Sequence, residues 1–221
     1  MNEEKTPGLG ELLRAPGEMM GFAEGKACSW RFALFLAAVT AAGCALFGFA
    51  VGSFVDLKVA ALDAAKMVGV AAFSFALSFP TLYVFTTISG SKLSPTRTAV
   101  LGLVCTATFG CILAALSPIL WLFAVSTESV GFMVFLACFL AWLALVFVAR
   151  PITVAKGKGI VVRTIGLNVW IVVLVVVALQ AVTLVRPMLA PIGSPRDPEG
   201  KCFFLMHFAK SLPSGSSVHA R

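Results

Sequence analysis

Two groups of charged residues have spacings that could support ion pairing or the binding of an anionic group. Asp56, Lys58, Asp63 and Lys66 alternate in sign, and Asp63 precedes Lys66 by three residues. Side chains three residues apart are neighbours on a helical turn, so this group is typical of a solvated, ion-paired turn. The stretch 156–159 reads Lys-Gly-Lys-Gly, which superficially resembles a phosphate-binding loop. Because it lacks the spacing of a Walker motif, we interpret it as a contact for lipid headgroups.

Other residue types that commonly carry chemistry are not arranged for it. The two histidines, His207 and His219, have no third ligand and no carboxylate pair nearby, which argues against a zinc site or a catalytic dyad. The six cysteines show no CxxC and no metal-type spacing. No serine, cysteine or carboxylate stands in the context of a nucleophilic triad. The sequence therefore predicts no catalytic, metal-binding or cofactor-binding residue, and a protein that is not an enzyme.

Five long apolar runs must position whatever function the chain has. They contain no Asp, Glu, Lys or Arg and cover residues 32–55, 67–91, 98–127, 129–149 and 164–185. A helix needs about 20 apolar residues to cross the ~30 Å hydrocarbon core of a bilayer, and every run reaches that length. The sequence thus predicts an all-α membrane protein with a five-helix transmembrane domain over 32–185. An amphipathic arm, 1–31, precedes this domain and a short tail, 186–221, follows it.

The charge distribution predicts the orientation of these spans. The arm and the short connections carry ten basic residues on one side of the membrane and two on the other. Cytoplasmic connections carry an excess of Lys and Arg, so we expect the N-terminus to be cytoplasmic and the tail to lie outside. Apolar residues of the arm recur at helical spacing, which is typical of short helices lying in the headgroup layer.

The net charge of +7 favours an anionic partner. Because the basic residues lie at the ends of apolar runs, we expect anionic lipid headgroups, at about 1 kcal/mol per basic residue close to the surface. The residues predicted to contact headgroups are Arg150, Lys156, Lys158 and Arg163. A nucleic-acid partner is not expected, since the aromatic residues lie in the spans and not beside basic residues on a folded face.

The third run contains the strongest helix-packing pattern. A stripe of small residues, Gly102, Thr106, Gly110, Ala114 and Pro118, recurs every four residues, and Gly48 and Gly52 repeat the spacing in the first run. Helices in lipid associate largely through close packing, and small residues let neighbouring backbones approach. The pattern predicts close helix contacts, either within the bundle or with another subunit.

The second run contains the best candidate for a polar path. Ser74, Ser78 and Thr81 share one face beside Pro80, which removes a helix hydrogen bond and should bend the span. These hydroxyls can bond the carbonyls that the proline frees, or they can line a path for a solute. The sequence leaves both interpretations open.

Several motifs resemble those of a known group of proteins. They are the arm motif 12–16 with 22–25, the second-run stretch 78–85 followed by 90–94, the Leu-Ser-Pro at 116–118, and the tail motifs at 186–187, 193–195 and 202–204. Together they resemble a group of uncharacterised bacterial polytopic membrane proteins that is distantly similar to the Yip-domain family. The resemblance implies five spans, a cytoplasmic N-terminus and an adaptor role, not an enzymatic one. The group has a longer aromatic and acidic tail, whereas 201–212 is shorter and basic here.

Two functions from different classes follow. The first is a non-enzymatic scaffold or accessory subunit of a membrane complex in the bacterial inner membrane, working with other subunits in a homo- or hetero-oligomer. The uncharged spans and the small-residue stripe favour it. The alternative is a small homo-oligomeric channel or carrier for an uncharged or anionic solute, favoured by the hydroxyl face beside Pro80.

Overall fold

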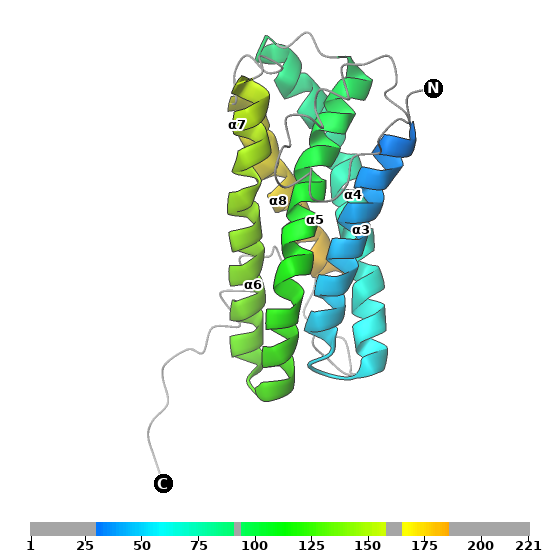
Figure 1. Ribbon diagram of the computed structural model, residues 1–221, viewed down its shortest axis with the longest axis vertical. Coiled ribbons are helices and arrows are strands. Elements are labelled where there is room, and N and C mark those ends of the chain that lie inside the picture. The colour runs from blue at the N-terminus through cyan, green and yellow to red at the C-terminus, as the bar shows by residue number, and fades with distance from the viewer. Residues whose placement is uncertain (1–29, 91–93, 158–164, 186–221) are drawn as a thin grey trace, which may run out of the picture.

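The chain forms an antiparallel bundle of helices, shown as a computed structural model in Figure 1. The structure describes residues 30–90, 94–157 and 165–185. Its helices are α3 (Trp30–Gly52), α4 (Leu57–Ile88), α5 (Pro95–Ser126), α6 (Val130–Phe147), α7 (Ala149–Gly157) and α8 (Ile165–Leu184). Five helical stretches are long and apolar enough to cross a membrane, with α6 continuing into α7 as one stretch, 130–153. The predicted all-α, five-span bundle is confirmed, whereas residues 1–29 of the predicted arm and the whole tail, 186–221, lie outside the described residues.

Polar caps set where the long helices begin. The Asp56 side chain accepts a hydrogen bond of 2.7 Å from the backbone N–H of Leu57 at the start of α4. Ser94 caps α5 by accepting from the N–H of Arg97, and a proline occupies the first turn of that helix. Ser129 caps α6 in the same way. Each cap satisfies a backbone donor that a helix start would otherwise leave unpaired, so the connections can be short.

The first connection is much shorter than the sequence predicted. We expected the second span to begin at Met67, but α4 begins at Leu57, and only residues 53–56 connect it to α3. The prediction of a solvated turn through Asp63 and Lys66 was wrong. Both residues lie inside α4, and the Asp63 side chain is fully buried. The apolar-run criterion stops at the first charge, whereas Ala, Leu and an i,i+3 ion pair favour continued helix.

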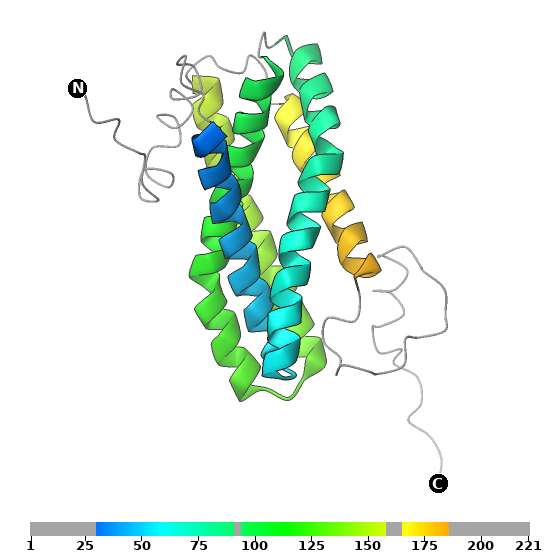
Figure 2. The ribbon, with the colours of Figure 1, turned by 90° about the vertical axis from the view of Figure 1, so that its right-hand side faces the viewer.

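α3 joins the two halves of the bundle. α3 packs along both α4 and α5, which also touch each other, while α6 packs against α5 and α8 against α4. In Figure 2, α8 starts beside the upper part of α4, crosses it and diverges from the bundle toward its own end. The two helices at the edges, α6 and α8, therefore each depend on one principal neighbour.

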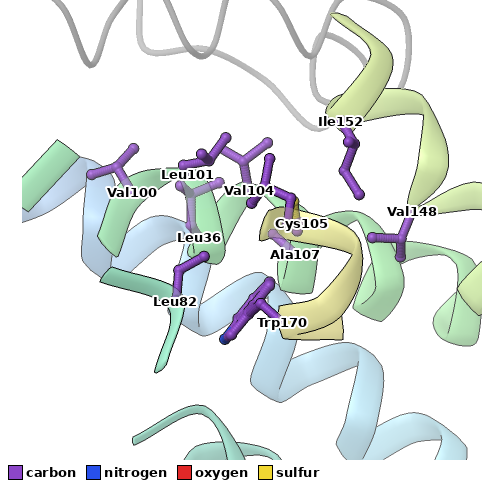
Figure 3. Packing of buried hydrophobic residues seen from close by; sticks show 11 residues of the cluster. Leu36, Leu82, Val100, Leu101, Val104, Cys105, Ala107, Val148, Ile152 and Trp170 are labelled. Atoms are coloured by element: carbon purple, nitrogen blue, oxygen red, sulfur yellow. The ribbon is translucent and has the colours of Figure 1, made fainter. Parts of the chain in front are cut away.

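Two apolar clusters fill the bundle, one toward each end. The cluster at the α7 end joins α3, α4, α5, α7 and α8 through Leu36, Leu82, Val100, Leu101, Val104, Cys105, Ala107, Val148, Ile152, Leu167 and Trp170. Figure 3 shows Trp170 reaching from α8 into this cluster near Leu82. The second cluster joins α3, α5 and α6 through Cys44, Phe47, Ala50, Leu113, Leu120, Ala124, Met133, Leu140 and Ala144. A fully buried tryptophan thus brings the last span into the core.

The outward face of α6 is strongly apolar. Of its 18 residues, only Met133, Leu140 and Ala144 are buried. Phe135, Phe139 and Trp142 are exposed, and neighbouring rings along this row contact one another, with the Phe135 and Phe139 rings stacked 6.3 Å apart. A water-soluble protein rarely exposes such a row, whereas hydrocarbon solvates it without cost.

Candidate functional site

Polar residues are buried mainly along one helix. Among the described residues, seven polar or charged side chains are buried, and four of them, Asp63, Ser74, Ser78 and Thr86, belong to α4. Asp63, Ser74 and Ser78 are spaced by 11 and 4 residues, close to whole helical turns, and Thr86 lies about 80° further round, so all four lie within one half of the helix surface. We call these four residues the α4 polar face. Because polar groups inside a membrane bundle are costly, this face is the candidate functional site.

The middle of the α4 polar face is closed by the last span. The Trp170 indole Nε1–H donates a hydrogen bond of 3.0 Å to the backbone carbonyl of Ser78, and both side chains are fully buried. The Ser78 hydroxyl itself donates to the carbonyl of Phe75 at 3.3 Å. A buried indole needs an acceptor, so this bond holds α8 in one register on α4.

A glycine lets α8 approach α4 this closely. A Cβ added at Gly166 would lie 2.6 Å from the carbonyl oxygen of Phe85, closer than real Cβ atoms come to another backbone. The glycine therefore sits one turn before Trp170 at a point where the two helices touch through their backbones. The sequence analysis missed Gly166, because a single glycine at the start of a span has no four-residue repeat.

The three predicted polar-path residues have different environments. Ser74 and Ser78 are buried in the protein, and Thr81 is only partly buried. The Ser74 hydroxyl has no hydrogen-bond partner among the described residues, whereas Thr86 donates to the carbonyl of Leu82 at 2.9 Å. The structure thus brings Ser74 and Ser78 to one interior face, and Pro80, which adjoins them in sequence, is exposed within a helix that continues through it.

At the N-terminal end of the α4 polar face, Asp63 forms an ion pair inside the bundle. Lys66 Nζ lies 2.8 Å from Asp63 Oδ1, and the two side chains are 26% and 0% exposed. The other carboxylate oxygen, Oδ2, has no hydrogen-bond partner among the described residues. The premise that no ionisable residue is buried in the bundle is therefore overturned by Asp63.

Glycines of α3 make the close approach at this ion pair. A Cβ added at Gly48 would lie 2.6 Å from the backbone oxygen of Asp63, and one at Gly52 would lie 2.6 Å from the Cα of Ala60. These two glycines, singled out in the sequence for their spacing, thus lie against the first turns of α4. The tight crossing therefore encloses the backbone of α4 at Asp63.

The small-residue stripe of α5 does not form a single contact. Gly102 lies against the side chains of α4, Gly110 lies against the backbone of α3, and Pro118 is exposed. Thr106 and Ala114 are partly buried between them. Steps of four residues on a helix with 3.6 residues per turn rotate the stripe by about 40° each time, so its ends face different neighbours.

The tightest of these contacts pairs two glycines. A Cβ added at Gly43 of α3 would collide with the backbone of Gly110, and one added at Gly110 would lie 2.9 Å from the Cα of Thr40. The sequence analysis did not include Gly43 in the packing pattern. It lies five residues before Gly48, which breaks the four-residue spacing, but the small residues 41–44 around it are a usable indication.

The predicted headgroup residues lie near the α7 end of the bundle as far as they are described. Arg150 is exposed at the start of α7, and its guanidinium carbon lies 5.4 Å from the centre of the Phe147 ring. Lys156 belongs to α7, which makes part of the predicted connection helical. Lys158 and Arg163, like the tail histidines, lie outside the described residues. No group of three metal-ligating side chains occurs within the described part of the chain.

Comparison with protein-family models, curated proteins and solved structures finds no match for this chain. The α4 polar face and the helix contacts around it are therefore the observations that bear on function.

The Gly43–Gly110 contact predicts that Gly110→Leu is strongly disruptive. Any side chain at this position meets α3 backbone atoms, which cannot move aside as a flexible side chain can. We expect a loss of folding free energy of about 1–3 kcal/mol or more, since overpacking a tight contact costs that much. Unfolding of the purified variant in detergent measures it.

Gly131→Leu is the matched control, because a Cβ added at Gly131 has no atom within 4 Å. Both changes place the same side chain in a helix, so they gain helix propensity equally. Equal stability of the two variants would contradict a close contact at Gly110.

The bond between Trp170 and Ser78 predicts a specific effect of Trp170→Phe. Phenylalanine keeps an aromatic ring in the cluster but cannot donate a hydrogen bond to the carbonyl. We expect α8 to be destabilised by about 0.5–1.5 kcal/mol, the usual net value of such a bond. Trp142→Phe, at an exposed position on α6, should have little effect. If both variants unfold at the same temperature as the wild type, the bond does not hold α8.

Proposed function

We propose that this multi-pass membrane protein is a non-enzymatic scaffold or accessory subunit of a complex in the bacterial inner membrane. The observation that supports this role most directly is the closure of the α4 polar face by α8. Ser78 is fully buried, its hydroxyl bonds the backbone of its own helix, and Trp170 occupies its carbonyl. Hydroxyl groups used in this way hold helices together and leave their face inaccessible to a passing solute.

The outer surface of the bundle offers contacts for other membrane subunits. The aromatic row on α6 presents large, rigid side chains that a neighbouring helix can pack against. An adaptor of this kind needs no reactive group of its own, and its specificity comes from shape. The role is of the same class as that implied by the proposed kinship with Yip-domain proteins.

The proposed orientation places the N-terminus in the cytoplasm. Arg31 in the first turn of α3, Arg97 in the first turn of α5 and Arg150 in the first turn of α7 belong to helix ends that the antiparallel arrangement brings to one side. Lys58, in the first turn of α4, belongs to the opposite side. Basic residues favour the cytoplasmic side, where anionic lipid headgroups are the proposed partner.

A second candidate function is a small channel or carrier for an uncharged or anionic solute. Two buried hydroxyls favour it, because Ser74 Oγ and Thr98 Oγ1 have no hydrogen-bond partner among the described residues. Buried polar atoms of this kind often bind ordered water, and a row of waters would be the beginning of a polar path.

Flux measurements separate the two functions. If the protein is a scaffold, the full-length chain in liposomes should pass neither ions nor small neutral solutes above the level of protein-free liposomes. It should also co-purify from native membranes with a fixed partner. Solute flux through the wild type that Ser78→Leu abolishes, with Ser78→Ala as the small-side-chain control for folding, would replace the scaffold by the carrier.

Cysteine labelling tests the orientation. In a chain whose six native cysteines are replaced, Gly157→Cys at the end of α7 should react with a membrane-impermeant maleimide only after the cytoplasmic side is opened. Lys58→Cys, exposed at the start of α4, is the matched position on the other side and should react in intact cells. The reverse pattern would overturn the proposed topology.

A further inference from the structure

Asp63 is a buried carboxylate whose surroundings compensate only one of its two oxygens. Oδ1 receives the Lys66 ammonium at 2.8 Å, whereas Oδ2 meets no hydrogen-bond donor in the described part of the chain. The side chain is 0% exposed, so bulk water does not complete the shell in this packing. Neighbouring acidic and basic residues that are exposed, such as Asp56 and Lys58, do not share this situation.

Within the described residues, the segment of α3 packed against the backbone of Asp63 adds no charge that would balance Oδ2. This segment, Gly48 to Gly52, contains no ionisable side chain. On α4 itself, Lys66 is the charged group in contact, and its side chain is partly exposed. The long lysine stem lets the ammonium extend toward the headgroup layer while it still reaches Oδ1.

A buried carboxylate with an unpaired oxygen has a chemical way to lower its free energy. An ionised oxygen that is removed from water without a donor is unfavourable, and such a group commonly takes up a proton and becomes neutral. Because the glycine crossing holds α3 and α4 backbone to backbone, the helices cannot rearrange easily to bring another donor to Oδ2. A partner that binds Oδ2 in this packing must therefore be very small.

We propose that Asp63 is a proton-binding site, on the side of the membrane where residues 53–56 connect α3 to α4. A proton from water forms an O–H bond at Oδ2, and the carboxylate becomes a neutral carboxylic acid. Lys66 keeps its own proton, and its contact with Oδ1 changes from an ion pair to a charge-assisted hydrogen bond from the ammonium to a neutral carboxyl group. The proton is the only species taken up, so the charge at this end of the bundle follows the pH on that side. This inference is independent of the choice between scaffold and carrier.

Selective labelling of aspartate tests the proposal on the full-length chain. The sequence contains three aspartates, Asp56, Asp63 and Asp197, so carboxyl-13C-aspartate gives three signals in protein reconstituted into lipid nanodiscs. We expect one carboxyl signal to stay protonated to higher pH than the other two. That signal should be lost in Asp63→Asn and kept in Asp56→Asn, a change at an exposed cap that asparagine also fills.

A second variant keeps the proposal falsifiable if Asp63→Asn does not fold. Lys66→Gln removes the ammonium that favours the ionised carboxylate, so the same signal should move to higher pH. The exposed Lys58→Gln serves as the control and should leave the signal in place. Three aspartate signals that titrate together in the wild type, or a wild-type midpoint that Lys66→Gln does not move, would overturn the proposal.

Discussion

The close approach of α3 to its two neighbours is the constraint on which the rest of the bundle depends. Gly43 meets Gly110 of α5, and Gly48 meets the backbone of Asp63 in α4. Lipid provides no hydrophobic driving force between helices, so contacts of this closeness supply much of the association. α3 thereby fixes α4 and α5 relative to each other, and the edge helices α6 and α8 attach to a pair that is already placed.

This arrangement explains why polar residues can be buried in α4. The interior hydroxyl of Ser78 is tolerated because it donates to the carbonyl of Phe75 in its own helix, and the Ser78 carbonyl accepts a hydrogen bond from the Trp170 indole. Asp63 lies at a close approach of α3 to α4, and its Oδ2 has no such partner among the described residues. The two positions differ in chemistry because one is an interhelical bond and the other is an incompletely paired charge.

The sequence predicted the fold class well and the interior poorly. Apolar runs are long and unambiguous, so the five spans could be predicted from composition alone. Asp63 could not be placed, because a charge beside the end of an apolar run reads equally well as loop or as helix. A close helix contact at Gly110 could be predicted from the spacing of small residues. Its partner Gly43 could not be predicted, because the residues that meet between two spans depend on how each helix is rotated. The role of Trp170 depends on a contact between residues 92 positions apart, which no local pattern encodes.

That same separation has a consequence for biosynthesis. The carbonyl of Ser78 enters the bilayer with α4, but the indole that pairs with it belongs to α8, which leaves the ribosome after three further helices, α5, α6 and α7. During synthesis of the intervening spans, α8 does not yet cover this part of α4. The carbonyl then needs another hydrogen-bond donor, such as water or a neighbouring protein. Docking of α8 is therefore the step that pairs the Ser78 carbonyl with the Trp170 indole. A nascent chain stalled before that step leaves this carbonyl without the indole, a difference that membrane chaperones and proteases can use to distinguish it from the finished protein.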